Sequence, residues 1–149
     1  MLWGGEDLAA ALGASANQRG GEYLGPYRLA RDLCLAGARA ADVVPVDAVY
    51  VDIRNIDGLR EEALNARRDG FEAKAIIHPA HAHVVNSAFT PDAEEIDWGR
   101  RVVAAYEAAP DAGVLNVDGK MVDRPHLLRA KQVLQRASAD AHESSALLP

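Results

Sequence analysis

A chain of 149 residues that is 49% hydrophobic and 26% charged has the size and composition of one globular domain with an apolar core. The net charge of −6, with lysines and arginines scattered among the acids, argues against a nucleic-acid-binding protein, which would carry a basic patch. No stretch approaches the ~20 apolar residues of a membrane span, and no basic segment precedes an apolar run, so we expect a cytoplasmic protein without a membrane partner. The single cysteine, Cys34, excludes an internal disulfide and a zinc site built from several thiolates.

The first part of the sequence begins with a strand signal and two helix signals. Residues 2–4 have the pattern of a strand end, and residues 7–12 predict a short helix that Gly13 can terminate. The polar, glycine-rich stretch 14–25 predicts a loop. Pro26 then suits the first turn of a second helix, which the following apolar stripe continues.

Two apolar runs predict further strands, each followed by a helix. The β-branched and aromatic run 46–53 precedes a helix over 58–69, for which Asp57 is the expected N-cap. The continuous apolar run 73–77 is typical of a strand that is buried on both faces, and a helix over 80–88 follows it. The order of strands and helices therefore predicts a parallel sheet with right-handed crossovers.

The pattern changes after residue 89. Thr90-Pro91 followed by acidic residues predicts the start of a long helix. The alternating stretch 113–122 contains Asp118-Gly119, a strong signal for a β-hairpin, and a last helix is expected to begin near Pro125. The chain is thus expected to have two parts and a tail: 1–89, 90–142 and a flexible 143–149.

Polar side chains follow all three predicted strands, and the carboxyl ends of parallel strands are where α/β proteins bind ligands. Glu6 and Asp7 come after two glycines, which let a ligand approach the backbone closely. The carboxylate of Asp7 could hold Mg²⁺, or it could simply cap the following helix. Asp52 and Arg54 could form a solvated ion pair, and His78 could be bonded to the backbone.

Two other features also allow a chemical and a structural interpretation. His78, His81 and His83 lie close together, but no thiol or acid completes a metal-binding set at suitable spacing. Asp123 lies between the predicted hairpin and the last helix, where it could act chemically or cap the helix.

Five stretches of the sequence carry a resemblance to a known family. They are GGEDLAAALGA, VDAVYVDIRNIDGL, ARRDGFEAKAIIHP, VVNSAFTPDAEEIDW and GKMVDRPHLLRA, and they cover most of residues 2–132. In this order they resemble the citrate lyase β-subunit family of the HpcH/HpaI aldolase superfamily, which includes citryl-CoA, citramalyl-CoA and malyl-CoA lyases. The resemblance implies an α/β fold, namely the C-terminal part of a (β/α)₈ TIM barrel with about three β/α units, followed by a helix–hairpin–helix lid.

The resemblance also implies a reaction and a set of residues for it. The reaction would be the Mg²⁺-dependent cleavage or formation of a carbon–carbon bond in a 3-hydroxyacyl-CoA thioester, giving an acyl-CoA and a small oxo acid. The catalytic acid or base would lie over the active site of a neighbouring subunit. The implied residues are Asp7 as metal ligand; Gly5, Glu6 and Asp7 for the oxo acid; Ile77, His78 and Pro79 for CoA; and Asp123 as acid or base.

By the same resemblance, the chain is expected to be truncated. A (β/α)₈ barrel takes about 200 residues or more, whereas this chain would begin at the sixth strand. The family's second metal-binding glutamate and its substrate-binding arginine have no counterpart here. We expect a homo-oligomer, since complete members of the family are trimers or hexamers, or an N-terminal half on another chain. The alternative is a non-catalytic fragment that acts as an oligomerising or weakly CoA-binding α/β module.

Overall fold

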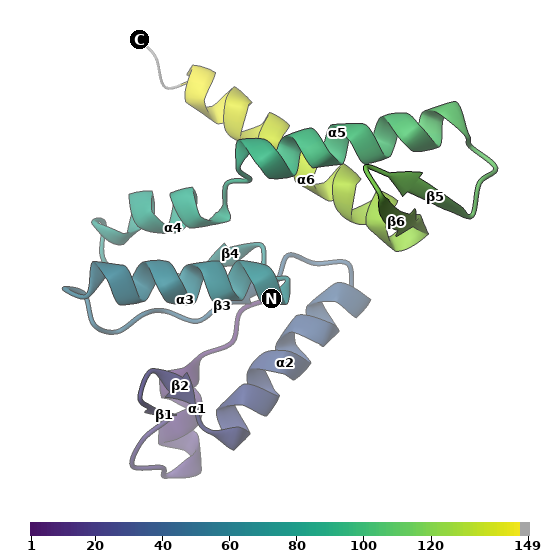
Figure 1. The fold of residues 1–149 in the computed structure, drawn as a ribbon. Coiled ribbons are helices and arrows are strands. Elements are labelled where there is room, and N and C mark those ends of the chain that lie inside the picture. The colour runs from purple at the N-terminus through teal and green to yellow at the C-terminus, as the bar shows by residue number, and fades with distance from the viewer. Residues whose placement is uncertain (147–149) are drawn as a thin grey trace. The chain divides into compact units, whose positions relative to one another are not determined.

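The structure is a computed structural model that describes the backbone of residues 1–146 and the side chains up to residue 139. The chain divides into two compact units, one from Met1 to Phe89 and a second that begins at Thr90 (Figure 1). They are called unit 1 and unit 2 below. None of the helices in the described part of the chain is long and apolar enough to cross a lipid bilayer.

Unit 1 contains a short parallel sheet. Strand β3 (Val46–Asp47) pairs in parallel with β4 (Ala73–Lys74), and Leu2 forms an isolated parallel bridge to Val46. The predicted parallel arrangement of the three segments is therefore confirmed.

The two predicted strands are shorter than expected. The prediction of strands over 46–53 and 73–77 is wrong, because regular pairing stops after two residues in each. The last ladder bond runs from the N–H of Ala75 to the carbonyl of Asp47 at 2.9 Å. The next carbonyl, that of Ala48, accepts from the side chain of Lys74 at 2.6 Å and not from a neighbouring strand. The apolar pattern continues beyond these points, but the backbone pairing that defines a strand does not.

Four helices belong to unit 1: α1 (Gly5–Leu12), α2 (Gly25–Ala40), α3 (Ile56–Asp69) and α4 (His81–Phe89). Gly13 and Gly70 end α1 and α3 in the left-handed conformation, with φ of 63° and 113°, as predicted. The predicted N-cap of α3 is wrong. Asn55 caps this helix by accepting a hydrogen bond from the N–H of Gly58 at 2.9 Å, and Asp57 lies in the first turn.

The predicted loop 14–25 is also only partly irregular. It contains a small antiparallel hairpin of β1 (Gln18–Arg19) and β2 (Glu22–Tyr23). Gly20 and Gly21 form its turn with φ of 62° and 83°, which glycine adopts at no steric cost. With only two residues in each strand, the hairpin leaves no alternating pattern for a sequence-based prediction to detect.

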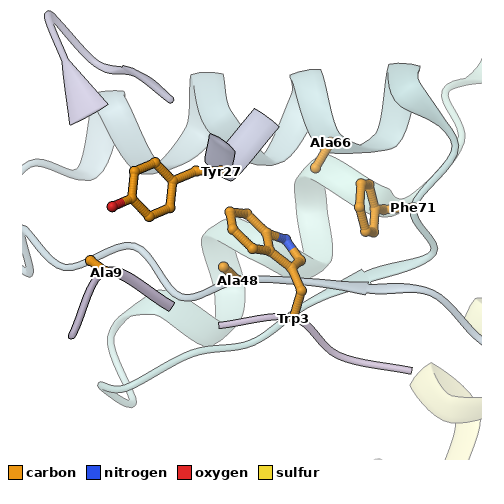
Figure 2. Close-up of a cluster of buried hydrophobic side chains, with 6 residues drawn as sticks. All are labelled: Trp3, Ala9, Tyr27, Ala48, Ala66 and Phe71. Carbon is orange, nitrogen blue, oxygen red and sulfur yellow. The ribbon is translucent and has the colours of Figure 1, made fainter. Parts of the chain in front are cut away.

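The main core of unit 1 gathers side chains from the strand segments and three helices (Figure 2). Trp3 packs edge-on against Tyr23, with 4.9 Å between the ring centroids. A second cluster joins α3 and α4. The buried members of the main core are Trp3, Ala9, Tyr27, Ala48, Ala66 and Phe71.

Unit 2 is a helix–hairpin–helix. Its elements are α5 (Ala93–Ala108), β5 (Val114–Val117), β6 (Lys120–Asp123) and α6 (Arg124–Ala146). The predicted hairpin is confirmed, since β5 and β6 pair antiparallel and Asp118 and Gly119 turn between them with φ of 53° and 78°. Buried Val102, Tyr106, Val117, Val122 and Ala130 form its core.

The ends of the two long helices differ from the prediction in detail. Asp92, and not Thr90, caps α5, because its side chain accepts from the N–H of Glu95 at 2.8 Å while Glu95 accepts from the N–H of Asp92. The backbone of α6 is helical to Ala146, which overlaps the first part of the predicted tail 143–149. Residues 147–149 lie outside the described residues.

Candidate active site

A small pocket opens at the edge of the sheet where the first strand segment and β3 end. Its volume is about 110 Å³. The structure brings the predicted residues Gly5, Glu6 and Asp7 together here, at the carboxyl end of parallel strands, where ligands bind in α/β folds. The lining residues are Leu2, Trp3, Gly4, Gly5, Glu6, Asp7, Tyr23, Ala48 and Val49.

Asp7 presents an exposed carboxylate at this pocket. It lies in the first turn of α1, and the N-cap of that helix is Gly4, so the interpretation of Asp7 as the cap is wrong. The carboxylate folds back over Gly4. A Cβ atom added at position 4 would lie only 2.6 Å from Oδ2 of Asp7. The absence of a side chain at Gly4 thus provides the space that the carboxylate occupies.

The first turn of α1 also offers backbone donors. The first helical hydrogen bond runs from the N–H of Leu8 to the carbonyl of Gly4 at 3.0 Å, so the N–H groups of Gly5, Glu6 and Asp7 have no acceptor within the helix. Such groups, at the positive end of the helix dipole, suit a carboxylate ligand. The side chain of Glu6 is engaged elsewhere, since it accepts from Nδ2 of Asn17 at 2.6 Å. Glu6 therefore offers the pocket its backbone N–H.

The pocket offers one possible metal ligand. Mg²⁺ binds oxygen ligands and keeps several waters, often with only one or two protein carboxylates, so the exposed carboxylate of Asp7 fits one ligand position. Within residues 1–139, no group of three or more His, Cys, Asp and Glu side chains is arranged to hold a metal ion. Asp7 is thus a candidate single ligand that needs a second carboxylate from elsewhere.

Behind the pocket lies a group of charged side chains that sequence reasoning missed. Asp47 on β3 and Lys74 on β4 are both buried, and Oδ2 of Asp47 lies 3.5 Å from Nζ of Lys74. Oδ1 of Asp47 accepts from Nε1 of Trp3 at 2.7 Å and from Nε of Arg31 at 2.9 Å. Nζ of Lys74 also contacts Oε1 of Glu62 at 2.5 Å. We call Arg31, Asp47, Glu62 and Lys74 the buried charge cluster.

The buried charge cluster keeps Asp47 ionised. Burial on its own would raise the pKa of Asp47, but the hydrogen bond from Arg31, the charge of Lys74 and the indole N–H of Trp3 together hold that pKa below its ordinary value. The neighbouring hydroxyl of Tyr23 has a raised pKa, first because of burial and then because of the negative charge of Glu62. One signal was present in the sequence. Each apolar run contains a charged residue, Asp47 or Lys74, and a charged side chain is almost never fully buried unless it is paired.

The residues predicted to bind CoA lie after β4. Ile77, His78 and Pro79 are all exposed. Nδ1 of His78 accepts from the N–H of Ala80 at 3.1 Å, which confirms the interpretation of His78 as bonded to the backbone. His81 is fully buried, and its Nε2 lies 3.2 Å from the carbonyl of Ile53. His81 therefore joins the turn after β4 to the loop after β3.

The other polar pair predicted at a strand end has a local role. Oδ1 of Asp52 accepts from the backbone N–H of Arg54 at 3.3 Å. Both side chains are exposed, and no ion pair joins them within the described residues. Asp52 therefore shapes the turn that leads into α3.

Asp123 lies in unit 2, where β6 ends and α6 begins. Its Oδ1 is 2.5 Å from Nδ1 of His126 and 3.5 Å from the N–H of the same residue. The hydrogen bond from His126 lowers the pKa of Asp123, which favours the ionised, proton-accepting form at neutral pH. Asp123 therefore occupies a capping position, as one interpretation predicted, and also pairs with a histidine that sequence reasoning missed. The signal available in the sequence was the spacing of three residues between Asp123 and His126 at the start of a helix.

The hairpin register places Asp123 on the exposed side of unit 2. Asp123 pairs with Val114, and Asn116 pairs with Met121, so these four residues share one face of the hairpin. Val114 and Met121 are 59% and 61% exposed, whereas Val122 on the other face is buried. The carboxylate thus lies among exposed apolar side chains.

Comparison with known proteins identifies the family. The HpcH/HpaI aldolase/citrate lyase family matches residues 1–79. A citrate lyase subunit beta-like protein of Mycobacterium tuberculosis (strain ATCC 25618 / H37Rv) is 40% identical over 96% of this chain and 52% of the relative. A (3S)-malyl-CoA thioesterase of Cereibacter sphaeroides (strain KD131 / KCTC 12085) is 40% identical over 95% of this chain and 49% of the relative.

A solved structure agrees with these sequence matches. The crystal structure of the protein CitE from Mycobacterium tuberculosis in complex with magnesium, acetoacetate and coenzyme A has a TM-score of 0.82 and 40% identity, and the match covers 93% of this chain and 51% of that one. The chain spans about half the length of the curated relatives it matches. Its sequence and its α/β fold show that it belongs to the HpcH/HpaI aldolase/citrate lyase family.

Proposed function

We propose that this chain supplies one part of the active site of a Mg²⁺-dependent carbon–carbon lyase that acts on CoA thioesters. The observation that carries the proposal is the pocket itself, where an exposed carboxylate on Asp7 lies beside the free N–H groups of the first turn of α1. A related protein with the same fold binds magnesium, acetoacetate and coenzyme A, which are a metal, an oxo acid and a thiol carrier that such a reaction would use.

The groups of the pocket suit the oxo acid. Its carboxylate would accept hydrogen bonds from the N–H groups of Gly5, Glu6 and Asp7, and Asp7 would be one ligand of the magnesium ion. The ion would supply a Lewis acid for the carbonyl or alkoxide oxygen. Ile77, His78 and Pro79, exposed beyond β4, would contact CoA.

Asp123 suits the proton transfer. In the direction of bond formation, its carboxylate would remove a proton from the carbon next to the thioester, the resulting enolate would attack the carbonyl carbon of the oxo acid, and the alkoxide so formed would take a proton from water. In the direction of cleavage, the 3-hydroxyl would lose its proton to water, the carbon–carbon bond would break to give the oxo acid and the enolate, and the protonated Asp123 would return its proton to the enolate carbon. The substrate would be a 3-hydroxyacyl-CoA of the malyl, citramalyl or citryl class.

The proposal includes the larger architecture. The parallel segments of unit 1 would be the last three strands of a (β/α)₈ barrel, and unit 2 would be a lid whose Asp123 acts at a neighbouring subunit. The lengths of the relatives support this, since each is about twice as long as the chain. The second metal carboxylate and the arginine for the substrate would belong to the other half of such a barrel, which the 149 residues do not include, so we expect no turnover by this chain alone.

Ligand binding tests the role of Asp7. Backbone amide NMR shifts would be followed during titration with Mg²⁺ and oxaloacetate, in the unchanged chain and in Asp7→Asn. We expect shifts at Gly5, Glu6 and residue 7 that the variant abolishes. Asp57→Asn is the matched control, because Asp57 is an exposed first-turn acid of another helix. Equal responses in the chain and in Asp7→Asn would refute the role of Asp7.

Turnover is a separate readout. The purified chain would be incubated with malyl-, citramalyl- and citryl-CoA, and release of oxo acid and of free CoA thiol would be measured separately. We expect neither product from the chain alone. Release of oxo acid that disappears in Asp7→Ala would show that the chain is an autonomous lyase. Release of thiol without oxo acid would instead show a thioesterase.

One observation favours a second candidate, an oligomerising α/β module. Large apolar side chains are exposed around the sheet of unit 1, and patches of this kind mark interfaces. They are Met1, Leu2, Val43, Val44, Val51, Ile53, Ile76 and Ile77, each at least 41% exposed. Light scattering after gel filtration would show self-association if these residues form an interface. A sharp monomer with cooperative unfolding would exclude this candidate.

A further inference from the structure

Beyond the last backbone hydrogen bond of the sheet, side-chain contacts hold the walls of the Asp7 pocket in place. The ladder between β3 and β4 ends with the bond from Ala75 to the carbonyl of Asp47. Ala48, the next residue, lines the pocket and has lost its strand neighbour. The opposite wall is formed by Trp3 and the two glycines after it. The parallel bridge from Leu2 to Val46 pairs the two wall segments just before the pocket, and beyond that bridge side-chain contacts connect Ala48 with Trp3.

Lys74 binds the backbone carbonyl of Ala48 at one wall. Its Nζ donates to the carbonyl of Ala48 at 2.6 Å and also contacts Glu62 at 2.5 Å and Asp47 at 3.5 Å. The first two contacts are hydrogen bonds, and the third is an ion pair. The side chain of Lys74 is 0% exposed, so no water competes with these contacts. The position of Ala48 is thereby fixed to that of Lys74.

Asp47 holds the other wall. It accepts from Nε1 of Trp3 at 2.7 Å. Trp3 immediately precedes the two glycines of the pocket. In Figure 2 the indole ring lies inside the core, with its nitrogen on the edge of the ring that faces Phe71. The guanidinium of Arg31 lies over the Phe71 ring at 4.6 Å and binds the same carboxylate. Both walls are thus linked through one pair, Asp47 and Lys74.

Stability does not by itself account for a charged pair at this place. Replacing a buried ion pair with apolar side chains of similar volume is often neutral or stabilising. An apolar side chain at position 74 could fill the same volume, but it could not donate to the carbonyl of Ala48. The feature that requires a cation is therefore the geometry at the end of the ladder.

We propose that Lys74 and Asp47 are positioning residues that set the separation of Ala48 and Trp3, and thereby the shape of the pocket in which Asp7 binds its ligand. The inference rests on the proposed function for its ligand, but its geometric part can be measured without one. Neither residue touches the ligand in this proposal. Their effect reaches it through the backbone of the pocket walls.

Lys74→Met is the main test. The variant nearly keeps the length of the side chain, and Asp47 keeps the contacts of Arg31, while Glu62 loses its contact with Lys74. We expect moved amide shifts at Gly4, Gly5 and Val49 without ligand, and an apparent Kd for Mg²⁺ with oxaloacetate at least tenfold weaker. Asp69→Asn is the matched control, because it removes the partner of Nη1 of Arg31 on the exposed rim of the cluster. The control should change the Kd less than twofold.

A second variant and a rescue guard against a folding defect. Trp3→Phe removes the N–H donor to Asp47 and keeps an aromatic ring, and it should move the same amide shifts. Lys74→Cys in a Cys34→Ala background, alkylated in the unfolded state to carry an aminoethyl group, should restore the original shifts. A neutral ethyl group on the same cysteine should not restore them.

The outcomes separate the two proposals. If the unchanged chain binds no Mg²⁺, the proposed function of the pocket fails, and the ligand-free amide shifts alone decide the role of Lys74. Unmoved shifts at Gly4, Gly5 and Val49 in Lys74→Met and Trp3→Phe would overturn the positioning role. So would a neutral ethyl group that restores them as well as the aminoethyl group does.

Discussion

Unit 1 and unit 2 build their cores in different ways. Unit 1 buries Asp47, Lys74 and His81 among its apolar side chains. The core of unit 2 is apolar, and none of its side chains up to residue 139 is a buried charge. The contacts also differ in range. The bond between Trp3 and Asp47 joins residues 44 positions apart, whereas α5 and α6 of unit 2 pack on each other across the short hairpin that joins them.

The difference shows what each unit depends on. Removing one member of a buried ion pair leaves an uncompensated charge, so unit 1 is sensitive to single substitutions and to pH. Unit 2 depends on the volume of its core and on local signals such as turns and caps. Each unit contains one tryptophan, Trp3 or Trp98, and the indole N–H resonances of the two can report on each unit separately.

The largest expected effect separates the two units most clearly. Asp47→Asn keeps the shape of the side chain but leaves Arg31 and Lys74 without their shared counter-charge. We expect a loss of roughly 3–5 kcal/mol in the free energy of unfolding, as for other broken buried pairs. Urea unfolding followed at the Trp3 resonance should show the loss, and the Trp98 resonance should not. An equal shift of both transitions would mean that the units unfold together.

The pH dependence sharpens this result. The folded-state pKa of Asp47 is lowered, so its contribution to stability is complete above the unfolded pKa of about 3.9 and is lost as the pH falls through the folded value. The difference in unfolding free energy between the chain and Asp47→Asn should therefore shrink from pH 5 downward. A difference that stays constant between pH 7 and pH 2 would contradict the paired state of Asp47.

Deleting volume from the apolar core should affect the other unit. Val122 is 0% exposed, and Val122→Ala should cost about 2–3 kcal/mol through lost burial and a cavity. The loss should appear at the Trp98 resonance and be the same at pH 5 and pH 7. Val114→Ala, on the exposed face of the same hairpin, should change stability by less than about 0.5 kcal/mol. A pH-dependent loss in Val122→Ala would contradict the proposed difference between the two units.

Local signals should have smaller effects. Asp92→Ala removes the N-cap of α5 and should destabilise unit 2 by about 1 kcal/mol. Asp111→Ala, an exposed acid outside the helices, provides the control. Urea unfolding followed by circular dichroism and by the Trp98 resonance would measure both variants. An equal loss in both would show that net charge matters here, and not the capping box.

The smallest expected effect is electrostatic. His126→Gln removes the imidazole that bonds to the carboxylate of Asp123. The pKa of Asp123 should rise toward the ordinary value of about 3.9, measured by carbon NMR of the carboxyl group. His83→Gln, an exposed histidine of unit 1, should leave it unchanged. An unmoved pKa in His126→Gln would show that the pair does not tune Asp123.

Sequence reasoning succeeded where the determining signal is local. The hairpin at Asp118-Gly119 and the helix end at Gly13 follow from backbone preferences of a few residues, and the structure confirms both. The parallel arrangement followed from the alternation of strands and helices. The position of Glu6 and Asp7 just after the first strand segment also followed from the sequence, whereas their role in binding stays a prediction.

It failed where the outcome depends on distant partners. The length of β3 could not be predicted, because it depends on pairing with segments that lie far along the chain. The buried charge cluster likewise joins four separate elements, and no spacing rule connects its members. The caps Asn55 and Asp92 were missed by two residues each, because several neighbouring polar side chains could form the same bond.

Gly4 has a consequence that reaches beyond the pocket walls. Its φ of −123° and ψ of 107° are extended values that any residue adopts, so the backbone at this position does not require glycine. The only nearby atoms that exclude a side chain belong to Asp7. A single methyl group at position 4 would therefore displace the carboxylate while every charge, helix and hydrogen-bonding backbone group stays in the sequence. Gly4 therefore leaves room for Oδ2 of Asp7, and Gly4→Ala would move that oxygen by steric contact while adding no charge to the chain.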